Sequence, residues 1–195
     1  MKYEFDKTIS TTVGGELIEY GFVWGNAKIV FIKTGSDGTV RGYEDKYLKM
    51  AHRVHERLGA TVICATNPEK KHTNFDEQVI RTVATKRGFR EFELYLVGTS
   101  DGGYKNLELA TRFFETVKYL GINTSLSSLE DLKDKLMKLS HIGKILVLGT
   151  RDDDYKELSA LKDSAIDNFK MIFVDGADHE FAGRVDEFVG LIDLL

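Results

Sequence analysis

The chain contains very little cysteine and proline. Cys64 is the only cysteine and Pro68 the only proline among 195 residues. One cysteine excludes a disulfide within the chain, and one proline excludes a proline-rich linker between domains. The sequence also lacks internal repeats and low-complexity stretches. A chain of this length can bury a core of its own, so we expect a single domain spanning residues 1–195.

The chain also lacks an excess of basic residues and any long apolar run. The 27 Lys and Arg residues are outnumbered by 31 Asp and Glu residues, so no basic surface predicts binding to nucleic acid. Apolar runs such as Ile29–Ile32 are far shorter than the roughly 20 residues that span a bilayer. The opening residues, MKYEFDKTIS, lack the apolar core of a signal peptide. We therefore expect a cytoplasmic protein that binds neither nucleic acid nor membranes.

The sequence does contain a regular alternation of short apolar runs and longer amphipathic segments. Two alternating runs flank Gly14-Gly15, which predicts a β-hairpin over Tyr3–Val23. Further strands are predicted at Ile29–Ile32, Thr61–Ala65, Leu94–Val97, Val117–Ile122, Ile145–Leu148 and Met171–Val174. Helices are predicted at Tyr43–Leu58, Phe75–Arg87, Gly103–Phe114, Leu129–Leu139, Tyr155–Phe169 and Glu180–Leu194. This order predicts an α/β layer fold with a mainly parallel sheet.

One of these strands runs directly into a G-x-S-x-G motif. The segment Leu94–Val97 is followed by Gly98-Thr99-Ser100-Asp101-Gly102, and a predicted helix comes next. This strand–turn–helix context is the one in which the motif presents a serine hydroxyl above the edge of a sheet. Glycines are needed at both ends because strand and helix approach closely. We therefore predict that Ser100 is a nucleophile.

A serine nucleophile needs a base and a group that orients the base. His179 is the only histidine that follows a predicted strand end, in the segment VDGADHEF. Three aspartates, Asp152, Asp153 and Asp154, follow the preceding strand. The carboxyl ends of parallel strands meet at one edge of a sheet, so His179 and one of these aspartates are the predicted base and acid. Asp152 is our choice, and Asp153 or Asp154 remains an alternative.

Together, the segments VGTSDGG, LVLGTRDDD and VDGADHEF resemble the nucleophile elbow, acid loop and histidine loop of the α/β-hydrolase superfamily. The resemblance covers nearly the whole chain. It implies a three-layer α/β/α sandwich with the N-terminal antiparallel hairpin on a mainly parallel sheet. It also implies a catalytic triad of Ser100, Asp152 and His179, because Asp commonly falls three residues after the glycine of the acid loop. Backbone N–H groups of Ser36 (or Gly35) and Asp101 are the implied oxyanion hole.

The chain departs from this resemblance in three places. The loop after Ile29–Ile32 reads Thr34-Gly35-Ser36 where many members have His-Gly, and the charged Asp101 follows the nucleophile. The interval from Asn123 to Gly143, where members often carry a lid, has room for one short helix. We therefore expect an open site that accepts a small acyl substrate. Acidic residues in the predicted site loops predict a mouth that disfavours anionic substrates.

These observations predict a serine hydrolase that cleaves a small ester or thioester through an acyl-enzyme, without a metal or organic cofactor. The alternative is a catalytically silent binding module of the same fold. A dinucleotide-binding domain is disfavoured because no G-x-G-x-x-G follows the first parallel strand. His52 and His55 lack a third metal ligand nearby and are interpreted as surface residues. Cys64 is interpreted as a core residue.

Overall fold

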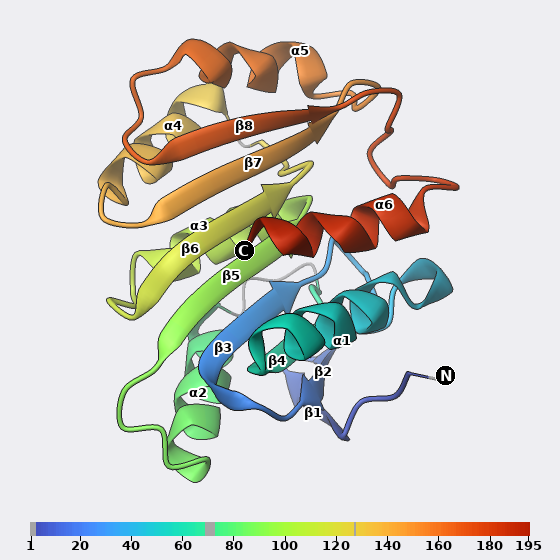
Figure 1. Ribbon diagram of the computed structural model, residues 1–195, viewed down its shortest axis with the longest axis vertical. Coiled ribbons are helices and arrows are strands. Elements are labelled where there is room, and N and C mark those ends of the chain that lie inside the picture. The colour runs from blue at the N-terminus through green and yellow to red at the C-terminus, as the bar shows by residue number, and fades with distance from the viewer. Residues whose placement is uncertain (1–2, 69–72, 127) are drawn as a thin grey trace.

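The computed structural model describes residues 3–68, 73–126 and 128–195, and Figure 1 shows the path of the chain. Eight strands form one sheet in the order β1-β2-β4-β3-β5-β6-β7-β8. Their bounds are β1 Lys7–Val13, β2 Glu16–Val23, β3 Asn26–Lys33, β4 Ala60–Ala65, β5 Glu93–Thr99, β6 Thr116–Ile122, β7 Gly143–Gly149 and β8 Phe169–Val174.

The hairpin of β1 and β2 is antiparallel, and β2 also pairs antiparallel with β4. All other strand pairs are parallel. The helices are α1 Lys46–Leu58, α2 Thr73–Lys86, α3 Asp101–Ala110, α4 Leu129–Lys138, α5 Tyr155–Leu158 and α6 Val185–Gly190. Short 3₁₀ turns are η1 Tyr43–Asp45, η2 Ser159–Asp163 and η3 Leu191–Leu194. The predicted α/β class and the N-terminal hairpin are confirmed.

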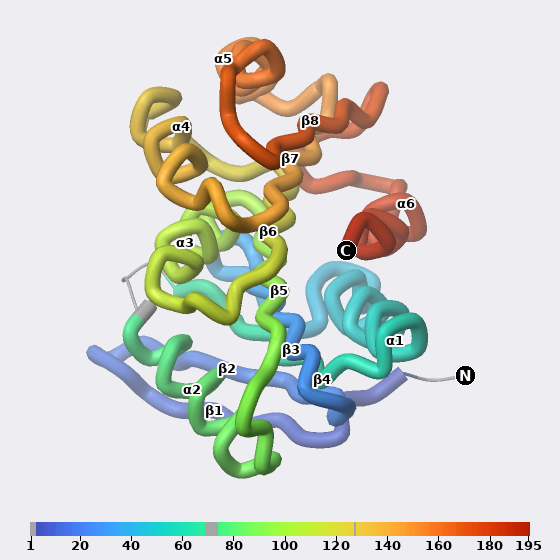
Figure 2. The backbone as a smooth tube through the Cα atoms, turned by 60° about the vertical axis from the view of Figure 1, so that its left-hand side comes forward, coloured from blue at the N-terminus to red at the C-terminus, as the bar shows by residue number. Residues whose placement is uncertain are grey.

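Helices cover both faces of the sheet. Figure 2 shows α2, α3 and α4 on one face, with α1 and α6 on the other. Alternate residues of the central strands serve the two cores: Ile29 and Phe31 pack in one, and Val30 and Ile32 in the other. Strands buried on both faces explain why these runs are almost continuously apolar. The predicted three-layer arrangement is therefore confirmed.

Two predicted helices are shorter in the structure. The segment Tyr155–Phe169 contains only α5 and η2, because Ser164 has extended backbone, with φ of −78° and ψ of 140°, Asn168 has positive φ, and Phe169 already belongs to β8. The segment Glu180–Leu194 begins as a loop. Phe181 and Gly183 have positive φ, which a right-handed helix excludes, so α6 starts at Val185.

The other helices differ from their predicted bounds at their ends. Glu44 and Asp45 have positive φ, so the segment predicted as Tyr43–Leu58 starts with η1 and α1 begins at Lys46. The helix predicted over Gly103–Phe114 is α3, which begins directly after Ser100. No helix within the described residues is long and apolar enough to cross a bilayer.

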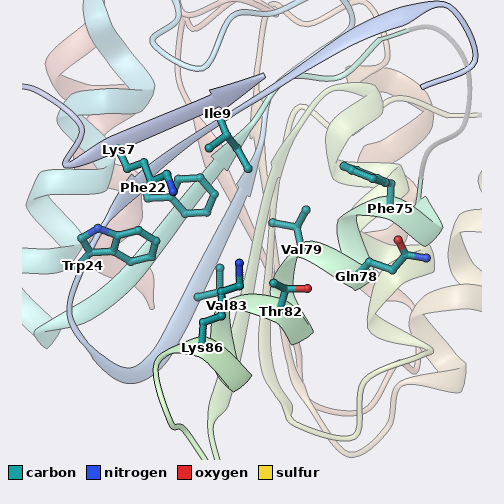
Figure 3. Close-up of a pocket in the computed structure, with 10 residues that line it drawn as sticks. All are labelled: Lys7, Ile9, Phe22, Trp24, Phe75, Gln78, Val79, Thr82, Val83 and Lys86. Carbon is teal, nitrogen blue, oxygen red and sulfur yellow. The ribbon is translucent and has the colours of Figure 1, made fainter. Parts of the chain in front are cut away.

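A cavity of about 290 Å³ lies between the hairpin and α2. Figure 3 shows Phe22 and Trp24 at the end of the hairpin opposite Val79 and Val83 of α2. Because β2 runs antiparallel to β4, this end of the hairpin lies toward the amino ends of the parallel strands. The loops that follow the carboxyl ends of β5, β7 and β8 are therefore at the other edge of the sheet, where the predicted site residues lie.

Candidate active site

Ser100 is the single residue between β5 and α3, and it has a backbone conformation that few residues adopt. Its φ is 55° and its ψ is −131°, and such strained conformations cost about 1–3 kcal/mol and cluster at functional sites. The turn is fixed on both sides, because the Ser100 N–H donates to the Ile122 carbonyl and the Gly103 N–H donates to the Ser100 carbonyl. The serine side chain is therefore held at the carboxyl edge of the sheet.

The glycines that flank Ser100 are required by close backbone contacts. A Cβ on Gly98 would lie 2.5 Å from Gly103, and one on Gly102 would lie 2.1 Å from the Thr34 carbonyl oxygen. Real Cβ atoms do not approach other atoms this closely. The two glycines let β5, α3 and the loop after β3 converge, which is the physical basis of the motif found in the sequence.

The three residues of the predicted triad lie together. The Ser100 Oγ is 2.9 Å from His179 Nε2, and His179 Nδ1 is 2.7 Å from Asp152 Oδ2. The Asp152 side chain is 1% exposed and that of His179 is 34% exposed. The hydrogen bond to Asp152 raises the pKa of His179 above its ordinary value of 6.5, and burial opposes this with a smaller effect.

Of the three adjoining aspartates, Asp152 contacts the histidine. Its second oxygen, Oδ1, accepts a hydrogen bond of 2.8 Å from the Asp154 N–H. Asp153 is exposed. Burial, and then the charge of Asp152, raise the pKa of the Asp154 carboxyl. The acid loop thus places Asp152 inward and uses the backbone of Asp154 to hold it.

Asn123, which the sequence analysis did not single out, ties the acid loop to the histidine loop. It follows β6, with φ of 43°. Its Oδ1 accepts from the Gly149 N–H at 2.8 Å, and its Nδ2 donates to the carbonyls of Asp178 and His179 at 3.0 and 2.9 Å. An asparagine directly after a predicted strand was the available signal, because asparagine tolerates positive φ and carries both donors and an acceptor.

Ser125 is a second residue that the sequence analysis missed. Its Oγ lies 2.9 Å from the Ser100 Oγ. If Ser100 donates to His179, then its remaining hydrogen bond must be accepted from Ser125. Serine is common in loops, so nothing in the residue pattern marked this position. The contact exists because the loop after β6 passes beside the nucleophile turn.

The loop after β3 lies next to the nucleophile. A Cβ on Gly35 would be 3.4 Å from the Ser100 Cβ. The Gly35 N–H donates weakly to the Tyr47 hydroxyl, at 3.5 Å. Within the described ranges, the N–H groups of Ser36 and Asp101 have no protein acceptor. Of the two backbone N–H groups considered in this loop, those of Gly35 and Ser36, the Ser36 N–H is therefore the one available to a substrate.

The carboxylate of Asp101 is paired. Its Oδ2 is 2.9 Å from Lys105 Nζ and accepts from Asn67 Nδ2 at 3.1 Å. Lys105 is 4% exposed and also donates to the Asn67 side chain at 2.7 Å. Glu180 likewise has a cationic partner, Lys46, at 3.4 Å. The mouth of the site therefore carries less negative charge than the sequence alone led us to expect.

A cavity of about 310 Å³ opens in front of Ser100. It is bounded by Gly35 and Ser36, by the start of α1 with Lys46 and Tyr47, and by Glu180. Between β6 and β7, within the described residues, the chain forms the ten-residue helix α4. The cavity is lined by the loop after β3, the start of α1, the nucleophile turn and the histidine loop.

The remaining candidate residues lie elsewhere. His52 Nε2 is 2.8 Å from the Glu4 carbonyl, and His55 Nδ1 is 2.9 Å from the Ala60 carbonyl. Cys64 is fully buried, and burial raises the pKa of its thiol. Among the residues described by the structure, no group of three or more His, Cys, Asp or Glu side chains is arranged to hold a metal ion.

Comparison with protein-family models and with curated proteins gives no match. Comparison with solved structures gives many. Est1E from Butyrivibrio proteoclasticus has a TM-score of 0.73 at 12% identity over 96% of both chains. An alpha-beta serine hydrolase homologue from Coxiella burnetii has a TM-score of 0.73 at 14% identity over 100% of both chains. A dienelactone hydrolase from Anabaena variabilis has a TM-score of 0.66 at 17% identity over 95% and 93%. The chain therefore has the α/β-hydrolase fold.

Proposed function

We propose that this chain is a serine hydrolase that cleaves a small carboxylic ester or thioester through an acyl-enzyme. The observation that supports this most strongly is the continuous hydrogen-bonded chain from Ser100 through His179 to Asp152. Esterases and serine hydrolase homologues among proteins of the same fold add support. Fold alone does not establish an activity, so the proposal depends on the geometry of the site.

In the proposed first step, Ser100 attacks the acyl carbonyl while its proton passes to His179 Nε2. The buried Asp152 accepts a hydrogen bond from His179 Nδ1–H, which selects the tautomer with a free Nε2. The resulting imidazolium is stabilised by the same carboxylate, consistent with the raised pKa of His179. The Oγ–C bond forms as the carbonyl π electrons move onto the oxygen.

The negative oxygen of this intermediate needs hydrogen-bond donors. The N–H groups of Asp101 and Ser36 are the proposed donors, because both are without a protein acceptor in the described ranges. Asp101 directly follows Ser100, and Ser36 lines the same cavity as Ser100. Such donors contribute about 3–4 kcal/mol each to the rate in hydrolases where they have been removed. The α3 N-terminus adds a favourable dipole at the same place.

The intermediate then collapses to the acyl-enzyme, and water completes the reaction by the same kind of proton transfers. His179 gives its proton to the leaving oxygen or sulfur, whose bond to the carbonyl carbon breaks. Water then attacks the acyl-serine and gives a proton to His179, and Ser100 regains its proton as the acid leaves. No metal or organic cofactor takes part in this scheme.

A fluorophosphonate probe tests the proposal, because it reacts with a serine that is activated as a nucleophile. We expect the wild type to be labelled and to hydrolyse 4-nitrophenyl acetate and butyrate. Ser100→Ala and His179→Ala should each lose the label and reduce kcat by about 10⁴-fold or more. Ser159→Ala, in η2, is the matched control and should be labelled like the wild type.

A folded wild type that neither takes the label nor cleaves either ester would contradict the proposal. That result would favour the alternative, a catalytically silent binding module. Label that persists in Ser100→Ala would place the reactive group on another residue.

A further inference from the structure

Lys46 is a cation placed where a cation is disfavoured. It is the first residue of α1 and is only 5% exposed. The N-terminal end of a helix carries a partial positive charge that repels a cation, and burying an ammonium group is costly unless it is well paired. The position of Lys46 therefore lowers stability unless something else compensates for it.

The protein pairs Lys46 poorly compared with its other buried lysines. Among the described residues, the other lysines in the buried class are Lys33, Lys105 and Lys144. Each of them donates at least one hydrogen bond of 2.7 Å. Lys46 Nζ instead lies 3.3 Å from the Glu180 carbonyl and 3.4 Å from Glu180 Oε2. An ammonium group has three donors, so Lys46 retains capacity for a better acceptor.

The partner of Lys46 is also loosely held. The Glu180 side chain is 73% exposed, so solvent weakens the ion pair. The ammonium group of Lys46 lies over two aromatic rings, with Nζ 4.7 Å from the Phe188 ring centre and 5.4 Å from that of Tyr47. The cation is therefore buried against aromatic rings, whereas the carboxylate of its counter-ion is exposed to solvent.

Lys46 and Ser100 line the same cavity of about 310 Å³, and Glu180 lies at its edge next to His179 in the chain. The other buried lysines do not line this cavity. We propose that Lys46 selects substrates that carry a carboxylate within a few atoms of the scissile carbonyl, with Glu180 as a counter-ion that the substrate carboxylate displaces. This inference rests on the proposed hydrolase function and names its substrate class.

The first test compares a charged ester with a neutral ester of the same shape. The pair is 4-nitrophenyl hemisuccinate and 4-nitrophenyl 4-methylpentanoate, with the charge on the acyl side. A second pair, 4-acetoxybenzoate and its methyl ester, places the charge on the leaving group. For each pair we take the ratio of kcat/KM values and compare variants, so that intrinsic ester reactivity cancels.

Lys46→Met should lower the charged-to-neutral ratio by about ten-fold or more for one of the two pairs, because a charge-assisted hydrogen bond is lost. Glu180→Gln should raise the same ratio by about three-fold, because a competing carboxylate is removed. Lys49→Met is the matched control: it removes the same charge from the same helix outside the cavity and should leave the ratio unchanged. Charged-to-neutral ratios that stay unchanged in both Lys46→Met and Glu180→Gln would overturn the inference. If Lys46→Met does not fold, an unchanged ratio in Glu180→Gln is sufficient to overturn it.

A binding measurement separates this inference from the proposed reaction. Calorimetric titration of Ser100→Ala with N-phenylsuccinamate should show binding that the neutral 4-methyl-N-phenylpentanamide lacks, and Lys46→Met in the same background should abolish it. Such binding in a protein without esterase activity would refute the hydrolase proposal and keep the role of Lys46. Ester cleavage with no charge preference and no N-phenylsuccinamate binding would refute the role of Lys46 and keep the hydrolase proposal.

Discussion

The nucleophile turn (Gly98–Gly103) and the histidine loop (Asp175–Arg184) both contain residues with positive φ, but different kinds of contact hold them. Ser100 is fixed by close backbone packing, through glycines that let β5, α3 and the loop after β3 meet, and by the hydrogen bond from its N–H to the Ile122 carbonyl. The histidine loop is held by residues far away in the chain, such as Asn123, 56 positions from His179.

The two regions also differ in what their contacts are made of. The nucleophile turn depends on the absence of side-chain atoms, since a Cβ at Gly102 would collide with a backbone carbonyl. The histidine loop depends on the hydrogen bonds of Asn123, Asp152 and the backbone of Arg151, whose N–H donates to the Ala177 carbonyl at 2.9 Å. Steric exclusion leaves one arrangement for the turn, whereas hydrogen bonds can be weakened one at a time.

Breaking the turn should have the largest effect. Gly102→Ala forces the Thr34 carbonyl and α3 apart, and we expect it to lower the free energy of unfolding by about 3 kcal/mol or more. It should also reduce kcat/KM by about 10³-fold, because the Asp101 N–H moves with the helix. Urea denaturation and ester hydrolysis measure the two effects.

Gly190→Ala, at the end of α6, is the matched control for Gly102→Ala. It has φ of −64° and nothing within 4 Å of an added Cβ. A helical Gly→Ala change of this kind should leave stability equal or up to about 1 kcal/mol higher. Equal stabilities for the two variants would mean that the turn relaxes at little cost.

Breaking the histidine loop should have an intermediate effect. Asn123→Ala removes three hydrogen bonds and puts alanine at φ of 43°, which should cost about 2–3 kcal/mol in unfolding free energy. We expect kcat/KM to fall by about 30-fold while KM changes little, because the acid and base lose their alignment.

Asn168→Ala is the control for the stability that Asn123→Ala loses because alanine disfavours positive φ. Asn168 also has positive φ, 51°, and donates to the Ser140 carbonyl at 2.8 Å, away from the site. It should lose stability without losing kcat/KM. Equal losses of activity in the two asparagine variants would refute a positioning role for Asn123.

The smallest expected effect is a shift in the pH dependence of kcat/KM. This shift reports on the histidine loop and not on the nucleophile turn. His179 acts as a base only when neutral, and its pKa is raised by the bond to Asp152. We therefore expect kcat/KM to rise with pH and to reach half of its plateau above pH 6.5, the ordinary value. Asp152→Asn should move this midpoint down, and Gly190→Ala should not.

Stability should follow the opposite trend. Because folding raises the pKa of His179, the folded state binds this proton more tightly than the unfolded state does, and protonation of His179 stabilises the fold. This contribution is fully present below the unfolded value of about 6.5 and is lost as pH rises through the folded value. The difference in unfolding free energy between wild type and His179→Ala should therefore shrink as pH increases, and a difference that grows with pH would contradict the assignment.

Residue order was sufficient for the fold class and for the strand ends that carry the candidate site. Strands buried on both faces leave uninterrupted apolar runs, and the sharp turn at Ser100 needs glycines at both ends, so each feature is visible locally. The last two predicted helices were wrong in length because Phe181 and Gly183 have positive φ and the backbone at Ser164 is extended. Those deviations follow from packing against other elements.

The class of fold, the nucleophile turn and the strand ends that carry Asp152 and His179 are therefore properties of short segments, because periodicity, glycine placement and chain order express them. The contact of Asp152 with His179, the clamp made by Asn123, the approach of Ser125 to Ser100 and the pairing of Asp101 with Lys105 needed the folded chain. Each joins side chains from separate loops or helical turns, and only the convergence of strand ends at one sheet edge sets those distances.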